Sequence, residues 1–391
     1  MNIFTLSKAP LYLLISLFLP TMAMAIDPPE RELSRFALKT NYLQSPDEGV
    51  YELAFDNASK KVFAAVTDRV NREANKGYLY SFNSDSLKVE NKYTMPYRAF
   101  SLAINQDKHQ LYIGHTQSAS LRISMFDTPT GKLVRTSDRL SFKAAYAADS
   151  RFEHFRHMVY SQDSDTLFVS YSNMLKTAEG MKPLHKLLML DGTTLALKGE
   201  VKDAYKGTAY GLTMDEKTQK IYVGGRDYIN EIDAKNQTLL RTIPLKDPRP
   251  QITSVQNLAV DSASDRAFVV VFDHDDRSGT KDGLYIFDLR DGKQLGYVHT
   301  GAGANAVKYN PKYNELYVTN FTSGTISVVD ATKYSITREF NMPVYPNQMV
   351  LSDDMDTLYI GIKEGFNRDW DPDVFVEGAK ERILSIDLKK S

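Results

Sequence analysis

Residues 315–330 read ELYVTNFTSGTISVVD, and this stretch decides the fold. An aliphatic–aromatic pair, Leu316-Tyr317, opens a segment rich in β-branched residues, and a second such segment ends at Asp330. Between them lie Asn320 to Gly324, which are small or polar except for Phe321. Alternating β-branched and aromatic residues bounded by Asn, Ser and Gly are typical of strands joined by a turn. The stretch therefore predicts two short β-strands of one sheet.

The same pattern recurs seven times along the chain. Each unit opens with a short alternating apolar segment and, after a polar turn, reaches an aliphatic–aromatic pair. The pairs are Val62-Phe63, Leu111-Tyr112, Leu167-Phe168, Ile221-Tyr222, Ala267-Phe268, Leu316-Tyr317 and Leu358-Tyr359. A third segment ends at Asn83, Asp127, Asp191, Asp233, Asp288, Asp330 and Asp387. The aromatic positions are 42 to 56 residues apart and long helical periodicity is absent. Such spacing predicts propeller blades of four short strands.

Ring closure is the next expectation. The last unit lacks an outer strand, because the chain ends shortly after Asp387. The segment Arg35–Leu43, ahead of the first unit, is predicted to supply that strand and to remove the open sheet edges. We therefore predict an all-β fold, a seven-bladed β-propeller with four-stranded antiparallel blades, as one domain over residues 26–391. Two stacked or sandwiched β domains are the alternative, although no linker interrupts the repeat.

The first 25 residues have the pattern of a secretory signal peptide. Lys8 is the only charged residue before Asp27, the apolar run Leu11–Leu19 follows it, and Ala23-Met24-Ala25 has the small-x-small pattern of a cleavage site. The apolar run is too short to span a membrane, so cleavage after Ala25 and a periplasmic location are predicted. An uncleaved anchor is the alternative.

Composition narrows the function further. The chain has no cysteine, which excludes disulfides, thiolate catalysis and Cys-ligated metals. The formal net charge is −1, and loss of Lys8 with the signal peptide leaves −2. This balance argues against nucleic-acid binding by bulk charge, although a local basic patch is compatible with it.

The quoted stretch resembles a known repeat. Tyr317-Val-Thr-Asn320, followed by Gly324-x-Ile-x-Val-Val-Asp330, resembles the signature of the YVTN-type β-propeller repeat family. Asn310-Pro311, Pro343–Asn347 and the order of signal, seven units and closing segment are similar to the periplasmic YncE proteins of that family. Other units, such as Tyr222-Val-Gly-Gly225, lack the signature and keep only residues typical of β-strands. The resemblance implies a seven-bladed periplasmic propeller, with expression linked to iron supply and an affinity for single-stranded DNA.

Loop lengths predict which face carries function. From the aromatic position to the end of the third segment, units one, three, five and seven span 20, 23, 20 and 28 residues, against 15, 11 and 13 in the others. These connections, and the long one from Ser141 to Arg156, are expected on one face. Elaborated loops on a rigid scaffold commonly carry function. Insertions that bind nothing are the alternative.

The residues expected at the channel mouth on that face favour a polar or anionic ligand. Two positions before each inner strand core stand Tyr51, Phe100, Arg156, Tyr210, Gln256, Asn305 and Asn347. The predicted ligand-binding set is Arg98, Phe100, Arg151, His154, Arg156, His157, Tyr210, Asn257, Asn305, Asn347 and Trp370. Its arginines could hold a carboxylate or phosphate, and its aromatic rings could stack on nucleobases. Packing between blades and pairing with local acids is the alternative for each residue.

Catalytic signatures are weak. His154-x-x-His157 has the spacing of a metal-ligand pair, but no third ligand stands at a fixed spacing, so no metal or cofactor is predicted. The Gly-x-Ser-x-Gly motif is absent. We therefore predict a binding module without a membrane span, for a small polar ligand, an envelope protein or single-stranded DNA. A hydrolase or lactonase, with Glu52, Arg156, His157 and Asn257 at the same mouth, is the alternative.

Overall fold

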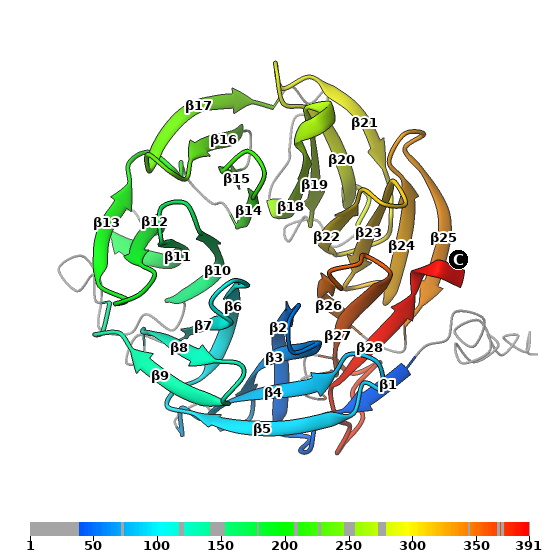
Figure 1. Cartoon of the computed structure of the whole chain (residues 1–391). Helices are drawn as coiled ribbons and strands as arrows, with labels where there is room; N and C mark the ends of the chain where they lie inside the picture. Colours follow the sequence, from blue (N-terminus) through cyan, green and yellow to red (C-terminus); the bar gives the residue numbers. More distant parts are fainter. Residues whose placement is uncertain are drawn as a thin grey trace, which may run out of the picture.

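The computed structural model describes residues 39–71, 74–116, 121–140, 153–177, 180–206, 210–225, 228–245, 255–272, 279–342, 345–365, 368 and 371–390. In these residues, 28 strands form seven four-stranded antiparallel sheets, which are arranged as blades around a central axis (Figure 1). The only helices described are two short 3-10 turns, Ser262–Ser264 and Leu388–Lys390. The predicted seven-bladed propeller is confirmed.

Each blade has four strands that run from the ring axis outward. The inner strands are β2 (Glu48–Asp56), β6 (Ala99–Asn105), β10 (His154–Ser161), β14 (Gly211–Asp215), β18 (Val255–Asp261), β22 (Ala304–Asn310) and β26 (Tyr345–Leu351). The second strands are β3 (Lys61–Asp68), β7 (Gln110–His115), β11 (Thr166–Thr177), β15 (Lys220–Gly224), β19 (Arg266–Val271), β23 (Glu315–Asn320) and β27 (Thr357–Lys363).

The third strands are β4 (Gly77–Asn83), β8 (Ile123–Asp127), β12 (Gly180–Asp191), β16 (Tyr228–Asp233), β20 (Gly283–Asp288), β24 (Thr325–Asp330) and β28 (Arg382–Asp387). The outer strands are β5 (Val89–Met95), β9 (Lys132–Thr136), β13 (Leu197–Val201), β17 (Thr238–Pro244), β21 (Gln294–Val298), β25 (Ser335–Asn341) and, for the seventh blade, β1 (Lys39–Tyr42).

The hydrophobic core lies between blades, not at the ring axis. Because side chains alternate across a strand, the two members of each aliphatic–aromatic pair point to opposite faces of their blade. Val62 packs in the cluster shared with the seventh blade, whereas Phe63 packs in the cluster shared with the second. All fourteen residues of the seven pairs are buried, and each pair contributes to two neighbouring clusters. The repeat in the sequence is therefore a repeat of inter-blade packing.

The ring is closed by the N-terminal strand, as predicted. β1 pairs antiparallel with β28, from Lys39 opposite Ser385 to Tyr42 opposite Arg382 (Figure 1). The Leu43 amide continues the ladder by donating to the Glu381 carbonyl at 2.8 Å. The first and last described strands thus share one sheet, and the seventh blade is completed by a strand that precedes the first.

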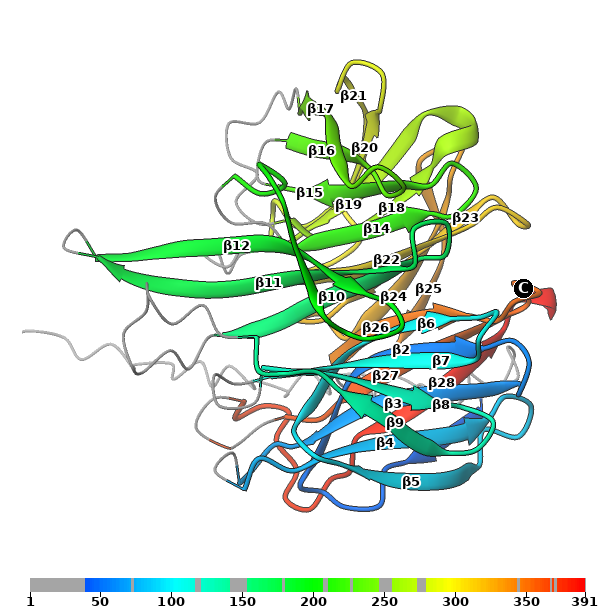
Figure 2. The same cartoon turned by 60° about the vertical axis from the view of Figure 1, so that its left-hand side comes forward.

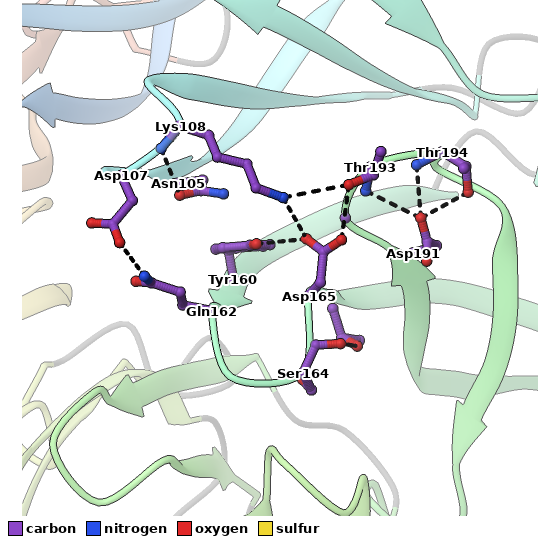
Figure 3. A network of polar contacts seen from close by, with 12 residues as sticks. Asn105, Asp107, Lys108, Tyr160, Gln162, Ser164, Asp165, Asp191, Thr193 and Thr194 are labelled. Carbon is purple, nitrogen blue, oxygen red and sulfur yellow. Dashed lines mark hydrogen bonds and ion pairs between the residues drawn. The ribbon is translucent and has the colours of Figure 1, made fainter.

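The acid that ends each third strand closes the turn that follows. Asp191 Oδ1 accepts hydrogen bonds from the amides of Thr193 at 3.1 Å and Thr194 at 2.7 Å (Figure 3). Beside this turn, Asp165 accepts from Thr193 Oγ1 at 2.8 Å and lies 3.4 Å from Lys108 Nζ of the preceding blade. The recurring acid therefore has a structural role on the face opposite the long connections.

The elaborated face differs from prediction in the third blade. The sequence predicted a long loop there, but β11 and β12 are twelve-residue strands paired as far as Thr177 opposite Gly180. Figure 2 shows this hairpin extending beyond the neighbouring blades. These residues form strands because pairing lets their backbone N–H and C=O groups hydrogen-bond across the hairpin. Segments 1–38 and 141–152, which include the predicted signal peptide, lie outside the described residues. No helix in the described part of the chain could cross a membrane.

Candidate binding site at the channel mouth

β-Bulges place one or two residues of most inner strands on the channel. In β2 the register jumps between Val50 and Glu52, so Tyr51 has no partner on β3. Equivalent shifts occur around Phe100, Arg156-His157, Gln256, Asn305 and Asn347-Gln348. A bulge redirects a side chain out of the ladder. Six of the seven inner strands of the described fold use this device, and Tyr210 directly precedes the seventh, β14.

These residues surround a cavity of about 370 Å³ at the mouth of the channel. Its lining is Tyr51, Glu52, Phe100, His154, Arg156, His157, Tyr210, Gln256, Phe272, Asn305, Phe321, Asn347, Gln348 and Lys363. All seven residues found by counting two positions before the strand cores are in this set. The cavity lies where the inner strands begin and the second strands end, which is the face with the extended β11–β12 hairpin.

One wall of the cavity is aromatic. The Tyr51 and Phe100 ring centroids are 4.6 Å apart, and the Phe100 and His154 rings meet edge to face at 5.6 Å. Lys363 Nζ lies 3.6 Å from the centroid of the Tyr51 ring, a cation–π contact. We call Tyr51, Phe100 and His154 the aromatic arc. It spans the first three blades and presents ring surface to the cavity.

The other side of the cavity carries four carboxamides, together with the rings of Phe272 and Phe321. Asn305 Nδ2 donates to Asn347 Oδ1 at 2.8 Å, and Asn347 Nδ2 donates to the Tyr51 carbonyl at 3.3 Å. Gln256 and Gln348 complete this set, which we call the amide arc. Its four residues come from the fifth, sixth and seventh blades. An amide both donates and accepts, so this wall can hydrogen-bond to polar edges of either kind.

Arg156 lies between the two arcs and has few partners. Its Nη2 donates to Gln256 Oε1 at 3.4 Å, and its guanidinium carbon lies 5.4 Å from the Tyr210 ring centroid. Its Nε is buried without a hydrogen-bond partner, and no carboxylate of the described residues forms an ion pair with it. Burial lowers the pKa of Arg156, but a guanidinium stays charged at neutral pH. The Glu52 carboxylate attracts this charge without pairing with it directly, so the guanidinium can still take a direct anionic partner.

His157, Glu52 and Lys308 form a charged group beside Arg156. His157 Nδ1 lies 3.5 Å from Glu52 Oε2, and both side chains are largely buried. Burial lowers the pKa of His157, and the Glu52 carboxylate only partly offsets this effect. Burial likewise lowers the pKa of Lys308 on β22, which Glu52 also attracts. Among the lining residues the structure describes, Glu52 is the single carboxylate, against Arg156 and Lys363.

Lys363 is held in place from beneath by Glu381. The Lys363 ammonium lies 3.7 Å from Glu381 Oε2, and the same oxygen accepts the Val50 amide at 2.6 Å. Arg69 Nη1 contacts the other Glu381 oxygen at 3.3 Å. Burial raises the pKa of Glu381, against the pull of the two cations. This group joins the first and seventh blades next to the ring closure and fixes one cation of the cavity.

Comparison with known proteins finds relatives of similar length. No family model matches the chain. It is 28% identical over 326 residues to the uncharacterized protein YncE of Salmonella typhi, covering 82% of this chain and 85% of that protein. The chain is a homologue of the YncE proteins. YncE of Salmonella typhimurium has the same identity and coverage, and YncE of Escherichia coli strain K12 is 25% identical over 322 residues, with 81% and 83% coverage.

A solved structure supports the fold of this YncE homologue. The structural search finds hydrazine synthase of Kuenenia stuttgartiensis with a TM-score of 0.61 and 10% sequence identity. The match covers 82% of this chain and 94% of that one. At this identity the likeness concerns the fold alone.

The structure brings seven of the eleven predicted ligand-binding residues to the cavity. They are Phe100, His154, Arg156, His157, Tyr210, Asn305 and Asn347. Arg98 is not among them, because its buried guanidinium donates to the Asp68 carbonyl and, at 3.1 Å, to Thr67 Oγ1. Asn257 follows the bulge at Gln256 and is buried in the ladder opposite Val270. Arg151 and Trp370 lie outside the described residues.

Several residues that line the cavity of the YncE homologue were not in the predicted ligand-binding set. Phe272, Phe321 and Lys363 stand at or just beyond the ends of second strands. Each is the fourth residue after the aromatic of its repeat pair, namely Phe268, Tyr317 and Tyr359. This constant offset is a signal in the sequence that could have identified them. In the described part of the chain, no group of three His, Asp or Glu side chains that could hold a metal ion occurs.

Proposed function

We propose that this YncE homologue is a propeller interaction module whose channel-mouth cavity binds a small, polar, negatively charged ligand. One observation carries the proposal: Arg156 lines the cavity, and among the described residues it has no ion-pair partner. Its Nε is buried, and Lys363 is a second cation in the same lining. Removing a charge from water without pairing it is destabilising, and an anion bound in the cavity would supply the partner that the half-buried Arg156 lacks. A carboxylate or phosphate suits the planar fork of an arginine.

Thermal unfolding of the purified protein tests this proposal. The probes are citrate, inorganic phosphate, glucose and a short single-stranded oligonucleotide, at matched ionic strength. An anion present at one hundred times its dissociation constant should stabilise the fold by about 2.7 kcal/mol. Arg156→Gln should remove that stabilisation. The matched control is Arg135→Gln on the outer strand β9, where the guanidinium only contacts the Thr194 carbonyl at 3.4 Å.

Two results would contradict the proposal. One is a stabilising anion whose effect survives in Arg156→Gln. The other is stabilisation by glucose alone, since a neutral sugar does not neutralise the guanidinium. Stabilisation by the oligonucleotide that depends on Arg156 and weakens steeply with salt would identify nucleic-acid phosphate as the anion.

A hydrolase or lactonase at the same mouth is favoured by one contact. The Glu52 carboxylate lies 3.5 Å from His157 Nδ1, as in sites where a carboxylate orients a catalytic imidazole. However, His157 Nε2, the atom that would accept a proton, is buried and without a partner. A general base must reach the proton it removes. We therefore favour binding over catalysis at this cavity.

The periplasm is the proposed location of this binding module. The proposal rests on the predicted signal peptide, residues 1–25. In that compartment, an envelope protein that contacts the elaborated face is a proposed partner alongside the small ligand.

A further inference from the structure

The cavity sorts its chemistry by position. Counted around the ring, the aromatic arc occupies the first three blades and the amide arc the fifth to seventh, where Phe272 and Phe321 add two more aromatic rings to the lining. Arg156, of the third blade, lies next to Tyr210 and Gln256 of the following two blades. Lys363, of the seventh blade, lies over Tyr51 of the first. The two cations therefore stand at the two junctions between an apolar wall and a hydrogen-bonding wall.

The aromatic arc is exposed to the cavity rather than absorbed by packing. Residues that fill the inter-blade core, such as Phe63 and Tyr112, are at most 1% exposed. Tyr51, Phe100 and His154 are instead half-buried and lie on bulges or at a strand start. Their rings contact one another in series, at 4.6 and 5.6 Å. The first pair of rings is tilted and the second meets edge to face, and such a cluster of aromatic rings favours a flat, unsaturated partner.

Two common classes of small polar ligand fit this lining poorly. A small aliphatic acid such as citrate would use the cations but leave the aromatic arc without a partner. A neutral sugar would use both walls but leave Arg156 unneutralised. A molecule that uses all three features needs a flat ring, polar atoms at the ring edge and one acidic group.

We propose that the cavity binds a planar aromatic or heteroaromatic acid. Its ring lies against the aromatic arc, its polar edge faces the amide arc, and its oxyanion lies at Arg156. This rests on the proposed anion-binding function and adds the class of ligand. A volume of about 370 Å³ accommodates a molecule with one or two rings and is at the lower end of ligand pockets.

Isothermal titration calorimetry with four probes tests the class. Indole-3-carboxylate has the ring, the polar edge and the charge, and 3-indoxyl phosphate carries a phosphate on the same ring. Indole-3-carboxamide lacks the charge, and cyclohexanecarboxylate lacks the flat ring. We expect at least one of the two aromatic anions to bind ten or more times tighter than both the carboxamide and the saturated acid. Which of the two aromatic anions binds more tightly shows whether the site prefers a carboxylate or a phosphate.

Variants assign the two contacts separately. Phe100→Leu should weaken binding of the aromatic anion about tenfold and leave the weak binding of cyclohexanecarboxylate unchanged, because only ring stacking is lost. Tyr51→Leu should also weaken binding of the aromatic anion. Agreement between the two variants would show that the loss does not come from a folding defect in one of them. The matched control is Tyr42→Leu on the outer strand β1, where the ring is 49% exposed. Arg156→Gln should weaken every anion.

The outcomes separate this inference from the proposed function. If cyclohexanecarboxylate binds as tightly as the aromatic anions and Arg156→Gln removes both, the aromatic class is wrong and anion binding stands. If Phe100→Leu and Tyr51→Leu leave the aromatic anions unaffected, the aromatic class is also wrong. If no probe binds in an Arg156-dependent way, the inference and the proposed function both fall.

Discussion

Burial sets the protonation of the histidines inside this propeller. His115, at the end of β7, is fully buried, and its Nε2 lies 2.7 Å from Ser124 Oγ. Desolvation lowers the pKa of His115 to about 4, and burial has the same effect on His185. Both imidazoles are therefore neutral in the folded protein at neutral pH. In the unfolded chain, a histidine takes up a proton near pH 6.5.

This difference predicts a loss of stability in mild acid. Above pH 6.5, His115 is neutral in the folded and the unfolded state, so its protonation does not reduce the free energy of unfolding. As the pH falls from 6.5 to about 4, only the unfolded state binds the proton, and the free energy of unfolding decreases. The shift corresponds to about 3 kcal/mol for His115. Urea unfolding at several pH values should show a free energy that decreases over this range, and a shallower decrease in His115→Gln. Exposed His299→Gln is the control, and an unchanged slope in His115→Gln would contradict the assignment.

At the scale of elements, the inner and outer strands have separate tasks. Bulges in the inner strands turn side chains toward the channel without interrupting the ladder on either side. The outer strands have mostly exposed residues and carry little of the core. β1 differs from the other outer strands, because it joins the N-terminal end of the described chain to the last blade and so closes the ring. Leu43, which follows it, is buried in the cluster between the first and seventh blades.

The hydrogen-bond pattern of β1 gives a sharp test of ring closure. The Leu43 amide donates to the Glu381 carbonyl, so by antiparallel alternation the Asn41 amide donates to Ile383 opposite it, whereas the Thr40 amide points outward. Asn41→Pro should remove one ladder bond and leave a carbonyl without a partner, at about 1–3 kcal/mol. Thr40→Pro should cost much less, since proline is tolerated where an edge amide faces solvent. Equal losses in urea unfolding would contradict this closure register.

At the scale of the molecule, stability comes from seven similar interfaces rather than from one core. Each hydrophobic cluster of the described residues joins two adjacent blades, and the seventh interface exists only because the ring is closed. A rigid ring of this kind holds side chains from all seven blades around one cavity. The site is therefore a property of the ring, since the blades it draws on are far apart in the sequence.

The whole chain should be exported and shortened. We expect mass spectrometry of the protein from a periplasmic extract to give a mature chain that begins at Ile26, because Ala23-Met24-Ala25 precedes it. Substituting Ala25→Arg should block cleavage and keep the precursor at the membrane, whereas Ala9→Ser, ahead of the apolar run, should be processed normally. Recovery of the intact chain beginning at Met1 from the soluble cytoplasmic fraction would contradict the predicted location.

The sequence by itself determined the blade count, the strand order and the closing strand. These features repeat locally, because each aliphatic–aromatic pair must bury one side chain on each face of its blade, and seven repeats leave seven visible marks. The same register located the residue of each blade that lines the cavity, including Arg156 and Asn305.

Only the tertiary structure decided which arginine faces the cavity and what surrounds it. Arg98 and Arg156 are alike in sequence, but Arg98 donates to backbone and hydroxyl groups of its neighbouring blade, whereas Arg156 lies on a bulge. The long segment of the third blade became extended strands, because pairing satisfied its backbone. Contacts such as Lys363 over Tyr51 join residues at opposite ends of the chain, so they arise only when the ring closes.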